Sequence, residues 1–144
     1  MIWLMRRERE TVTVPLIVSD FDAAISFYCG TTEQFEVEHD ITAPNGLRNV
    51  CLGHITLPLS LGLRLADTPE KAQLLGRQSG DRNDAFLILP VAACEPLLQR
   101  LQTAGMRVED NGIIDLIWGS QLCCYDPFGT MICFIEWNPY FGRA

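Results

Sequence analysis

The sequence predicts an α+β protein in which the order β-α-β-β-β occurs twice. Short runs of alternating apolar and polar residues, typical of half-buried strands, recur along both halves of the chain. Two segments of helical periodicity each follow the first strand of a half, and turn residues separate the other strands. The length of 144 residues gives room for one domain with a real core, or for two small, closely packed modules.

The first half begins with an alternating strand at 11–18, in which three valines and one leucine share a face. A helix at about 20–29 follows, because Ser19 or Asp20 can cap its start and its apolar residues form one stripe. Gly30 is expected to end this helix. Three further strands are expected at 33–40, 47–53 and 57–65.

The second half repeats this order after an interruption. Residues 66–82 are rich in turn-forming and charged side chains, which predicts a linker with one or two helical turns. A strand at 84–91 comes next, and then a helix from about 93 to 104 with Gly105 at its C-terminal end. The remaining strands are expected near 106–109, 113–118, 122–125 and 131–137.

The stretch 118–137, W-G-S-Q-L-C-C-Y-D-P-F-G-T-M-I-C-F-I-E-W, predicts a hairpin of two apolar strands. In its turn, Asp126 can bond its own backbone, Pro127 presets φ, and Gly129 accepts a positive φ. The order of W-G, a short strand, D-P-x-G and an apolar strand resembles the last hairpin of the glyoxalase/bleomycin resistance/dioxygenase superfamily, the vicinal oxygen chelate fold.

The segment V-S-D-F-D-A-A-I-S-F-Y at 18–28 is similar to the first strand and helix of the same superfamily. The resemblance covers about 12–137 and implies two βαβββ modules that form one curved mixed sheet around a cup. We therefore expect one glyoxalase-like domain at 11–138. Its parts and flanks are an N-terminal extension at 1–10, a first module at 11–65, a linker at 66–82, a second module at 83–138 and a C-terminal tail at 139–144.

The resemblance also implies where a divalent metal would be held, by one side chain from the first strand and one from the last strand of each half. These ligands are usually His or Gln and Glu. The positions fall on Thr13, Gly62, Asn83 and Cys133, with Asp84 as a one-residue alternative to Asn83. Because Thr, Gly, Asn and Cys do not make the N/O site of a Lewis-acid enzyme, we expect no metal and no other cofactor.

The histidines and cysteines offer no other complete metal site. His39 and His54 lack the spacing of a chelating pair, and with Cys133 either would give at most a thiolate–imidazole pair. We expect each histidine to be a hydrogen-bonded core or rim residue. The six cysteines show no C-x-x-C pair, and no export signal is recognisable, so we expect reduced, buried, small apolar residues.

Charge and hydropathy exclude two classes of partner. The net charge of −7, from 11 basic and 18 acidic residues, argues against binding to a nucleic-acid backbone. No apolar run approaches the roughly 20 residues that a membrane helix needs. Glu36, Glu38 and Asp40 form a row on one strand face, which we interpret as solvated surface, with a cation-binding rim as the alternative. We expect a cytoplasmic protein without nucleic-acid or membrane partners.

Strand parity surrounds the vacant metal positions with a mostly apolar lining and a few hydrogen-bonding groups, which suits a small organic ligand. Metal-free members of the superfamily sequester antibiotics, so the resemblance implies small-molecule binding of this kind. The alternatives are a metal-dependent lyase, isomerase or ring-cleaving dioxygenase with unusual ligands, and a dimer without a ligand. A homodimer is expected in each case, because an open sheet leaves edges exposed. The residues placed in the lining include Thr13, Arg64, Asn83, Leu87, Cys133 and Trp137.

Overall fold

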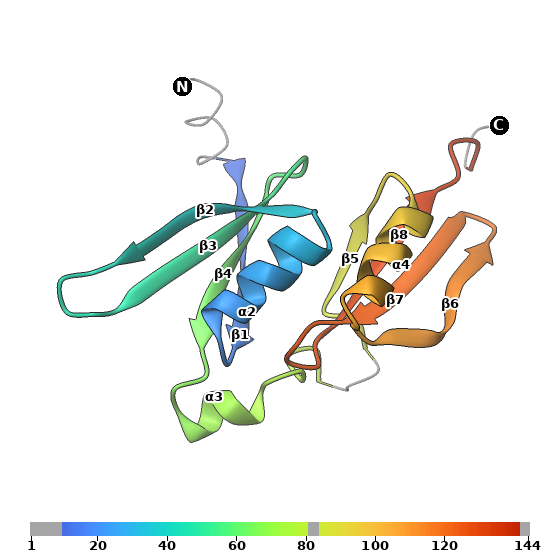
Figure 1. Cartoon of the computed structure of the whole chain (residues 1–144). Helices are drawn as coiled ribbons and strands as arrows, with labels where there is room; N and C mark the ends of the chain where they lie inside the picture. The colour runs from blue at the N-terminus through green and yellow to red at the C-terminus, as the bar shows by residue number, and fades with distance from the viewer. Residues whose placement is uncertain (1–9, 81–83, 142–144) are drawn as a thin grey trace. The chain divides into compact units, whose positions relative to one another are not determined.

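The computed structural model describes residues 10–80 and 84–141, and the chain forms two compact units that divide between Ala72 and Gln73. Each unit holds one four-stranded sheet of mixed strand direction and has the element order β-α-β-β-β (Figure 1). The α+β class and the repeated module order predicted from the sequence are confirmed. Most of the expected extension at 1–10 lies outside the described residues, as does Asn83. Among the helices of the described residues, none has the length and apolar character needed to cross a membrane.

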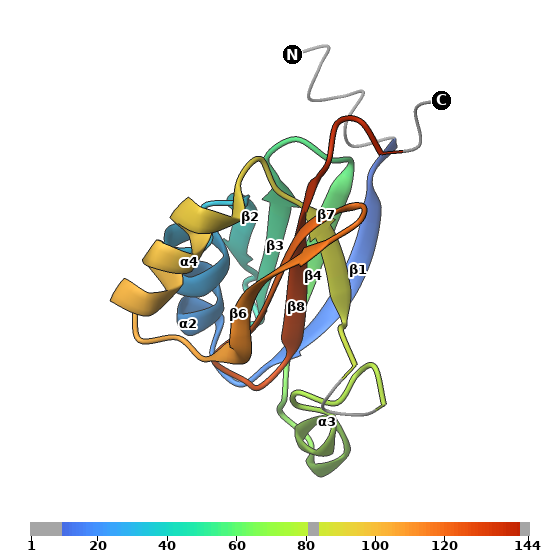
Figure 2. The ribbon, with the colours of Figure 1, turned by 90° about the vertical axis from the view of Figure 1, so that its right-hand side faces the viewer.

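The first unit orders its strands β1-β4-β3-β2, with β1 parallel to β4 and the other neighbours antiparallel. One face of this sheet is covered by the helical segment that follows β1 (Figure 2). The elements are β1 (Val12–Val18), α2 (Phe21–Ile25), the π-helix η1 (Ser26–Thr31), β2 (Phe35–Thr42), β3 (Arg48–His54) and β4 (Leu59–Leu65).

The helical segment differs from the single α-helix expected up to Gly30. Its start is as predicted, because the carboxylate of Asp20 accepts a hydrogen bond from the N–H of Ala23 at 3.1 Å. The α-helix then gives way to the π-helix, whose end is marked by the N–H of Thr32 donating to the carbonyl of Phe27, five residues back, at 2.9 Å. Gly30 lies inside η1 and does not end the helix.

A bulge in β2 changes the strand faces that simple alternation predicts. Glu38 is the extra residue: before it Glu36 pairs with Gly53, and after it Asp40 pairs with Val50. Gly53 and Val50 are three residues apart on β3 and therefore belong to opposite faces of the sheet, so Glu36 and Asp40 point to opposite faces as well. The expectation that the three acidic residues share one face is therefore wrong. Asp40 lies on the face of Val50, which is fully buried.

The second unit orders its strands β5-β8-β7-β6, with β5 parallel to β8. A short helix in the segment between the two sheets confirms the helical turns expected there. The elements are α3 (Pro69–Gln73), β5 (Leu87–Pro90), α4 (Cys94–Thr103), β6 (Val108–Leu116), β7 (Gly119–Tyr125) and β8 (Met131–Trp137).

β6 is one irregular strand where the sequence indicates two. Its pairing with β7 moves from Val108 opposite Cys124 to Ile113 opposite Leu122, which advances five residues on β6 and only two on β7. The extra residues include Gly112, which has a φ of 58°. Because the bulged residues interrupt the apolar alternation, periodicity alone divides the strand in two.

The predicted hairpin of β7 and β8 is confirmed. Oδ1 of Asp126 accepts hydrogen bonds from the N–H groups of Phe128 and Thr130, both at 2.9 Å. Gly129 has a φ of 87°, which only glycine adopts without strain. The turn residues therefore fix both the position of the turn and the register of the two strands.

Gly119 meets a second constraint at the other end of this hairpin. Its φ is 149°, and a Cβ atom there would fall against the backbone oxygen of Glu136. The next residue pair closes the hairpin, because the N–H of Asn138 donates to the carbonyl of Trp118 at 2.7 Å. The glycine of the W-G motif is thus required by the close approach of the two backbones.

α4 covers one face of the second sheet (Figure 2). Leu97 and Leu101 are fully buried there. The N-cap residue Ala93 makes no side-chain hydrogen bond, and the N–H of Cys94 instead donates to the carboxylate of Glu136 on β8 at 2.8 Å. The carboxylate of Glu136 therefore accepts a hydrogen bond from one of the N–H groups that have no partner within the first turn of α4.

The expectation that Leu87 shares a face with Cys133 is wrong. Leu87 pairs with Ile132, which is fully buried, and Ile88 pairs with Cys133. Paired residues of parallel strands point to the same face, so Ile88, 62% exposed, takes the place beside Cys133. The register between two strands far apart in sequence is set by tertiary pairing, which alternation within one strand does not reveal.

Candidate ligand-binding site

The sheet of the first unit has a gap between β3 and β4. β3 and β4 are paired from Gly53 opposite Ser60 to Cys51 opposite Gly62, and their pairing stops there. β3 nevertheless begins three residues before Cys51, and β4 continues three residues beyond Gly62. The start of β3 remains paired with β2, and the end of β4 remains paired with β1. The central pair of strands therefore separates while each outer pair stays intact.

A pocket of about 590 Å³ lies at this gap, within the usual size range of small-molecule sites. Its walls come from the start of α2, the loop between β2 and β3, the first residues of β3, the end of β4 and the start of α3. Two of its apolar residues are open to solvent, since Leu47 is 67% and Leu65 is 38% exposed. Phe21 and Leu63 complete the apolar part of the lining.

Arg48 fixes the wall on the β3 side. Its Nε and Nη2 donate to the two carboxylate oxygens of Asp40 at 2.9 and 2.7 Å, and Nη2 also donates to Asp22 at 2.9 Å. The guanidinium lies 5.5 Å from the ring centre of Phe21. The hydrogen bonds from Arg48 hold the pKa of Asp40 below its usual value, and the two carboxylates raise the pKa of Arg48. This group ties β2, β3 and the start of α2 together.

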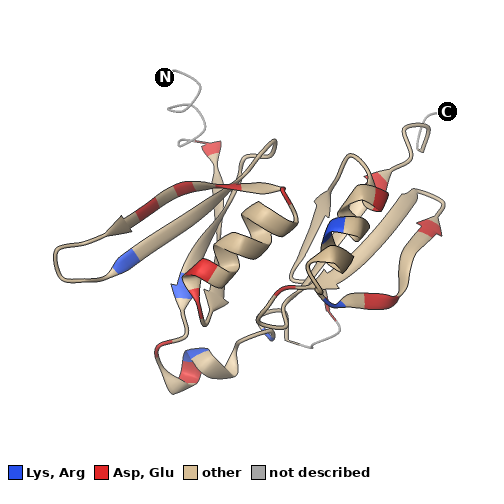
Figure 3. Cartoon of the chain, in the orientation of Figure 1, with Lys and Arg blue, Asp and Glu red and all other residues tan. Residues whose placement is uncertain are grey.

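Arg64 differs from the other two cations of the lining. Lys71 is paired with Asp67 at 3.0 Å, and Arg48 is held by its two carboxylates. Within the described parts of the chain, Arg64 makes no ion pair and no side-chain hydrogen bond, and it is exposed. Figure 3 shows how the charged positions are distributed over the elements of this unit. Arg64 was predicted as a ligand-binding residue, and the structure places it in the pocket wall.

Thr13 and Gly62 occupy two of the positions that the resemblance assigns to a metal. They lie on the same face of the sheet, because Thr13 pairs with Ser60, two residues before Gly62. The Cγ2 atom of Thr13 lies 3.1 Å from where a Cβ of residue 62 would be. Thr13 therefore already fills the space beside Gly62, and no side chain from residue 62 is present to bind a cation.

A small polar cluster lies on this same face. Ser60, 1% exposed, donates to Glu38 at 2.8 Å, and the thiol of Cys51 lies 3.2 Å from the same carboxylate oxygen. Burial and the neighbouring carboxylate raise the pKa of Cys51 to about 11. Glu38 is thus held by neutral donors, and Cys51 remains a thiol at neutral pH.

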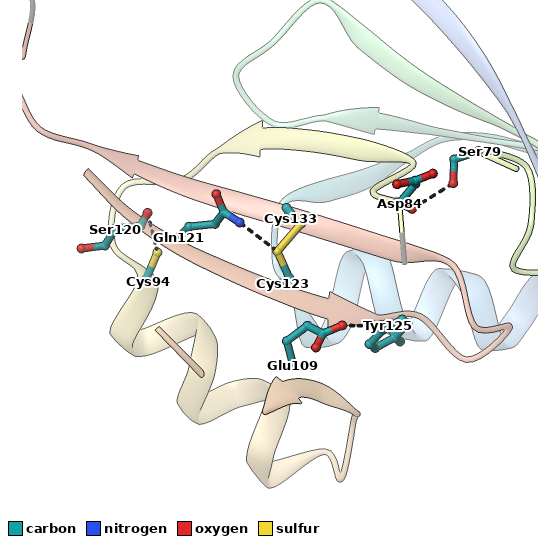
Figure 4. Close-up of a disulfide and its surroundings, with 9 residues drawn as sticks. All are labelled: Ser79, Asp84, Cys94, Glu109, Ser120, Gln121, Cys123, Tyr125 and Cys133. Atoms are coloured by element: carbon teal, nitrogen blue, oxygen red, sulfur yellow. Dashed lines mark hydrogen bonds between the residues drawn. A yellow bond between two sulfur atoms is a disulfide. The ribbon is translucent and has the colours of Figure 1, made fainter. Parts of the chain in front are cut away.

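Cys133 is joined to Cys123 by a disulfide across the hairpin of β7 and β8 (Figure 4). The two residues are directly opposite each other, with 4.1 Å between their Cα atoms. The expectation that all cysteines are reduced is therefore wrong for this pair. Cys124, the next residue on β7, points to the opposite face and is a free, buried thiol.

The second unit places Trp137 on the same strand face as Cys133, four residues along β8. Its side chain is 52% exposed. Thr13 and Arg64 likewise share one face of the first sheet. The members of each pair thus share a sheet face but lie four residue positions apart along it, and Asn83 lies outside the described residues. The roles of all five residues in ligand binding stay predictions, those of Thr13, Arg64, Asn83, Cys133 and Trp137.

Each histidine has a hydrogen-bond partner within the protein. Nδ1 of the buried His54 accepts hydrogen bonds from the N–H groups of Thr56 and Leu57 at 3.1 and 3.0 Å. His39 lies 3.4 Å from the side-chain oxygen of Asn49. Across the described residues no three His, Cys, Asp or Glu side chains converge as a metal site. The positions that the resemblance assigns to a divalent metal hold Gly62, Thr13 and Cys133. Gly62 has no side chain, Thr13 packs against it, and Cys133 is in a disulfide, so these residues do not fit such a metal.

The sequence does not single out the other residues of the pocket. Phe21 and Leu47 read as ordinary apolar positions, and Arg48 reads as the first residue of a strand after a turn. Arg48 and Asp22 are 26 residues apart, and the bulge in β2 moves Asp40 to their side of the sheet. The single local signal is the short loop with Gly46 at a φ of 86°, which sets where β3 begins.

No protein-family model matches the sequence, and no curated protein matches it. Solved structures do match. The chain is similar to UcmS2, at 22% identity and a TM-score of 0.70, over 88% of this chain and 96% of that one. It is similar to a glyoxalase/bleomycin resistance protein from Streptomyces sp. CB03234, at 24% identity and a TM-score of 0.65, over 87% and 98%. It is also similar to TnmS3, an antibiotic binding protein from the same source, at 23% identity and a TM-score of 0.66, over 89% and 95%.

Proposed function

We propose, from the premise that this chain has the glyoxalase/bleomycin resistance fold, that it binds a small organic molecule in the pocket between β3 and β4. The observation that carries the proposal is a pocket of about 590 Å³ that combines apolar side chains with one guanidinium, that of Arg64, which has no ion pair among the described residues. Ligand sites are commonly apolar clefts with a few placed polar groups, and this lining has that character. The description of TnmS3 as an antibiotic binding protein supports sequestration of an antibiotic-like molecule.

The chemistry of the lining favours binding over catalysis. It contains no His, Cys, Ser or Glu, and its carboxylate, that of Asp67, is paired with Lys71. A general base or a nucleophile would need one of these groups free at the ligand. We therefore propose binding that needs no metal, since Gly62 offers no donor and Cys133 is in a disulfide. A metal-dependent lyase, isomerase or dioxygenase remains the alternative that the experiment below separates.

The proposed binding is tested with N-phenyl-1-naphthylamine, a neutral aromatic compound whose fluorescence rises in apolar surroundings. We expect saturable binding at one site per chain. Asn49→Trp fills the pocket and should weaken binding at least about tenfold, a loss of roughly 1.4 kcal/mol. Ile41→Trp is the matched control, because Ile41 pairs with Asn49 on β2 but does not line the pocket.

The metal dependence is measured in the same titration after chelation. Unchanged binding supports a metal-free site. Binding that is lost on chelation and restored by zinc or manganese would favour the enzyme alternative. If wild-type protein shows no saturable binding, or if both tryptophan variants bind equally well, the pocket is not the site.

We also propose that the chain works as a homodimer with one glyoxalase-like domain at 11–138. Open sheet edges and exposed apolar residues such as Val12 and Ile88, each 62% exposed, support this proposal. Light scattering should then give about twice the chain mass of 16.2 kDa. A stable mass of one chain at micromolar concentration would contradict it.

A further inference from the structure

We propose that the ligand of this pocket carries an anionic group, such as a carboxylate, sulfonate or phosphonate, on an apolar body, and that Arg64 binds that group. The inference rests on the proposed function, because it names the ligand class of the same pocket. It starts from the unequal pairing of the charges that line the gap between β3 and β4.

Three cations and one carboxylate line the pocket. Arg48 is neutralised by Asp22 and Asp40, and Lys71 is neutralised by Asp67. Within the described residues, the guanidinium of Arg64 has no such partner. Its planar fork of N–H donors matches the paired oxygens of a carboxylate, sulfonate or phosphonate.

The apolar part of the lining gives the rest of the ligand a place beside Arg64. Leu65 follows Arg64 on β4 and is 38% exposed, and Leu47 across the gap is 67% exposed. A ligand body lying between these side chains and Phe21 would remove that apolar surface from water. The charged end would then reach Arg64 without breaking the ion pairs of Arg48 or Lys71.

A cationic ligand is disfavoured at the same place. The carboxylate of the lining, Asp67, is held by Lys71 at 3.0 Å, so a cation would meet Arg64 without a free counter-charge. The net charge of −7 repels anions at long range. A preference for anions must therefore come from the local site. Because Arg48 and Lys71 are already paired, Arg64 is the cation to which we assign this preference.

The test compares two compounds with the same aromatic body. N-Phenyl-1-naphthylamine is neutral, and 1-anilinonaphthalene-8-sulfonate adds one sulfonate to it. We expect the sulfonate to bind the wild-type protein about tenfold more tightly, which corresponds to roughly 1.4 kcal/mol. Arg64→Gln should remove this preference while leaving binding of the neutral compound within about twofold. High salt, near 1 M, should reduce the preference in the wild type.

Arg77→Gln is the matched control, because it changes the net charge equally and Arg77 is an exposed residue outside the pocket. It should keep the preference for the sulfonate. Equal binding of the two compounds by the wild type, or equal loss of preference in both variants, would overturn the role of Arg64 while the pocket itself stands. Absence of binding by either compound would instead overturn the proposed function.

Discussion

Replacing Gly119 by alanine should destabilise the protein by more than any other glycine-to-alanine change considered below. Two effects add at this position. A residue with a side chain is strained at a φ of 149°, at a cost of about 1–3 kcal/mol. The new Cβ would also meet the backbone oxygen of Glu136 and lie 3.0 Å from the N atom of Asn138. Because both neighbours are backbone atoms, the hairpin itself must shift.

Two control substitutions separate these effects. Gly105→Ala has only the backbone strain, since φ is 69° and nothing lies within 4 Å of its Cβ position. Gly30→Ala has neither effect, and reduced freedom of the unfolded chain should leave it unchanged or up to about 1 kcal/mol more stable. We expect losses in the free energy of unfolding of about 1 kcal/mol for Gly105→Ala and at least about 3 kcal/mol for Gly119→Ala.

The measurement is urea unfolding followed by tryptophan fluorescence, to which Trp118 and Trp137 beside Gly119 contribute. A loss of 3 kcal/mol is a large part of the 5–15 kcal/mol typical of domains, so the transition should move clearly to lower urea. If Gly119→Ala were no less stable than Gly105→Ala, the close backbone approach would not be a constraint. The glycine of the W-G motif would then be replaceable by alanine.

Other consequences concern pH and the cysteines. The folded pKa of Asp40 lies below its unfolded value of 3.8, so its contribution to stability is full above that pH and is lost as the pH falls further. Asp40→Asn should therefore flatten acid unfolding below about pH 4, whereas Asp110→Asn, at an exposed position, should not. The Cys123–Cys133 disulfide closes a loop with a sequence separation of 10, so its reduction should cost about 2–3 kcal/mol, measured by thermal or urea unfolding. If alkylation of the denatured chain adds the same mass with and without prior reduction, the bond is absent. Burial raises the pKa of Cys124 to about 12, and that of Cys51 is about 11, so neither thiol should react with a disulfide reagent at pH 8 in folded protein. Fast labelling of Cys124, located by peptide mapping, would contradict its burial.

The sequence by itself determined the features that depend on neighbouring residues. The D-P-F-G turn, the cap at Asp20 and the repeated order of elements follow from local backbone preferences and periodicity, and the structure confirms them. The disulfide was within reach of the same reasoning. Once the turn places Tyr125 opposite Met131, the register puts Cys123 opposite Cys133. Composition and the absence of a recognised export signal pointed instead to reduced thiols.

Only the tertiary structure decided the site. The pocket exists because β3 and β4 separate beyond Cys51 and Gly62, and pairing between strands is not written in either strand alone. One extra residue in β2 places Asp40 beside Arg48, whereas strict alternation places it on the other face. The same holds for Arg64: the sequence indicated its strand face, but only the ion pairs of Arg48 and Lys71 show which cation of the pocket has no partner among the described residues. Contacts between distant segments depend on the whole packed chain, so local patterns cannot supply them.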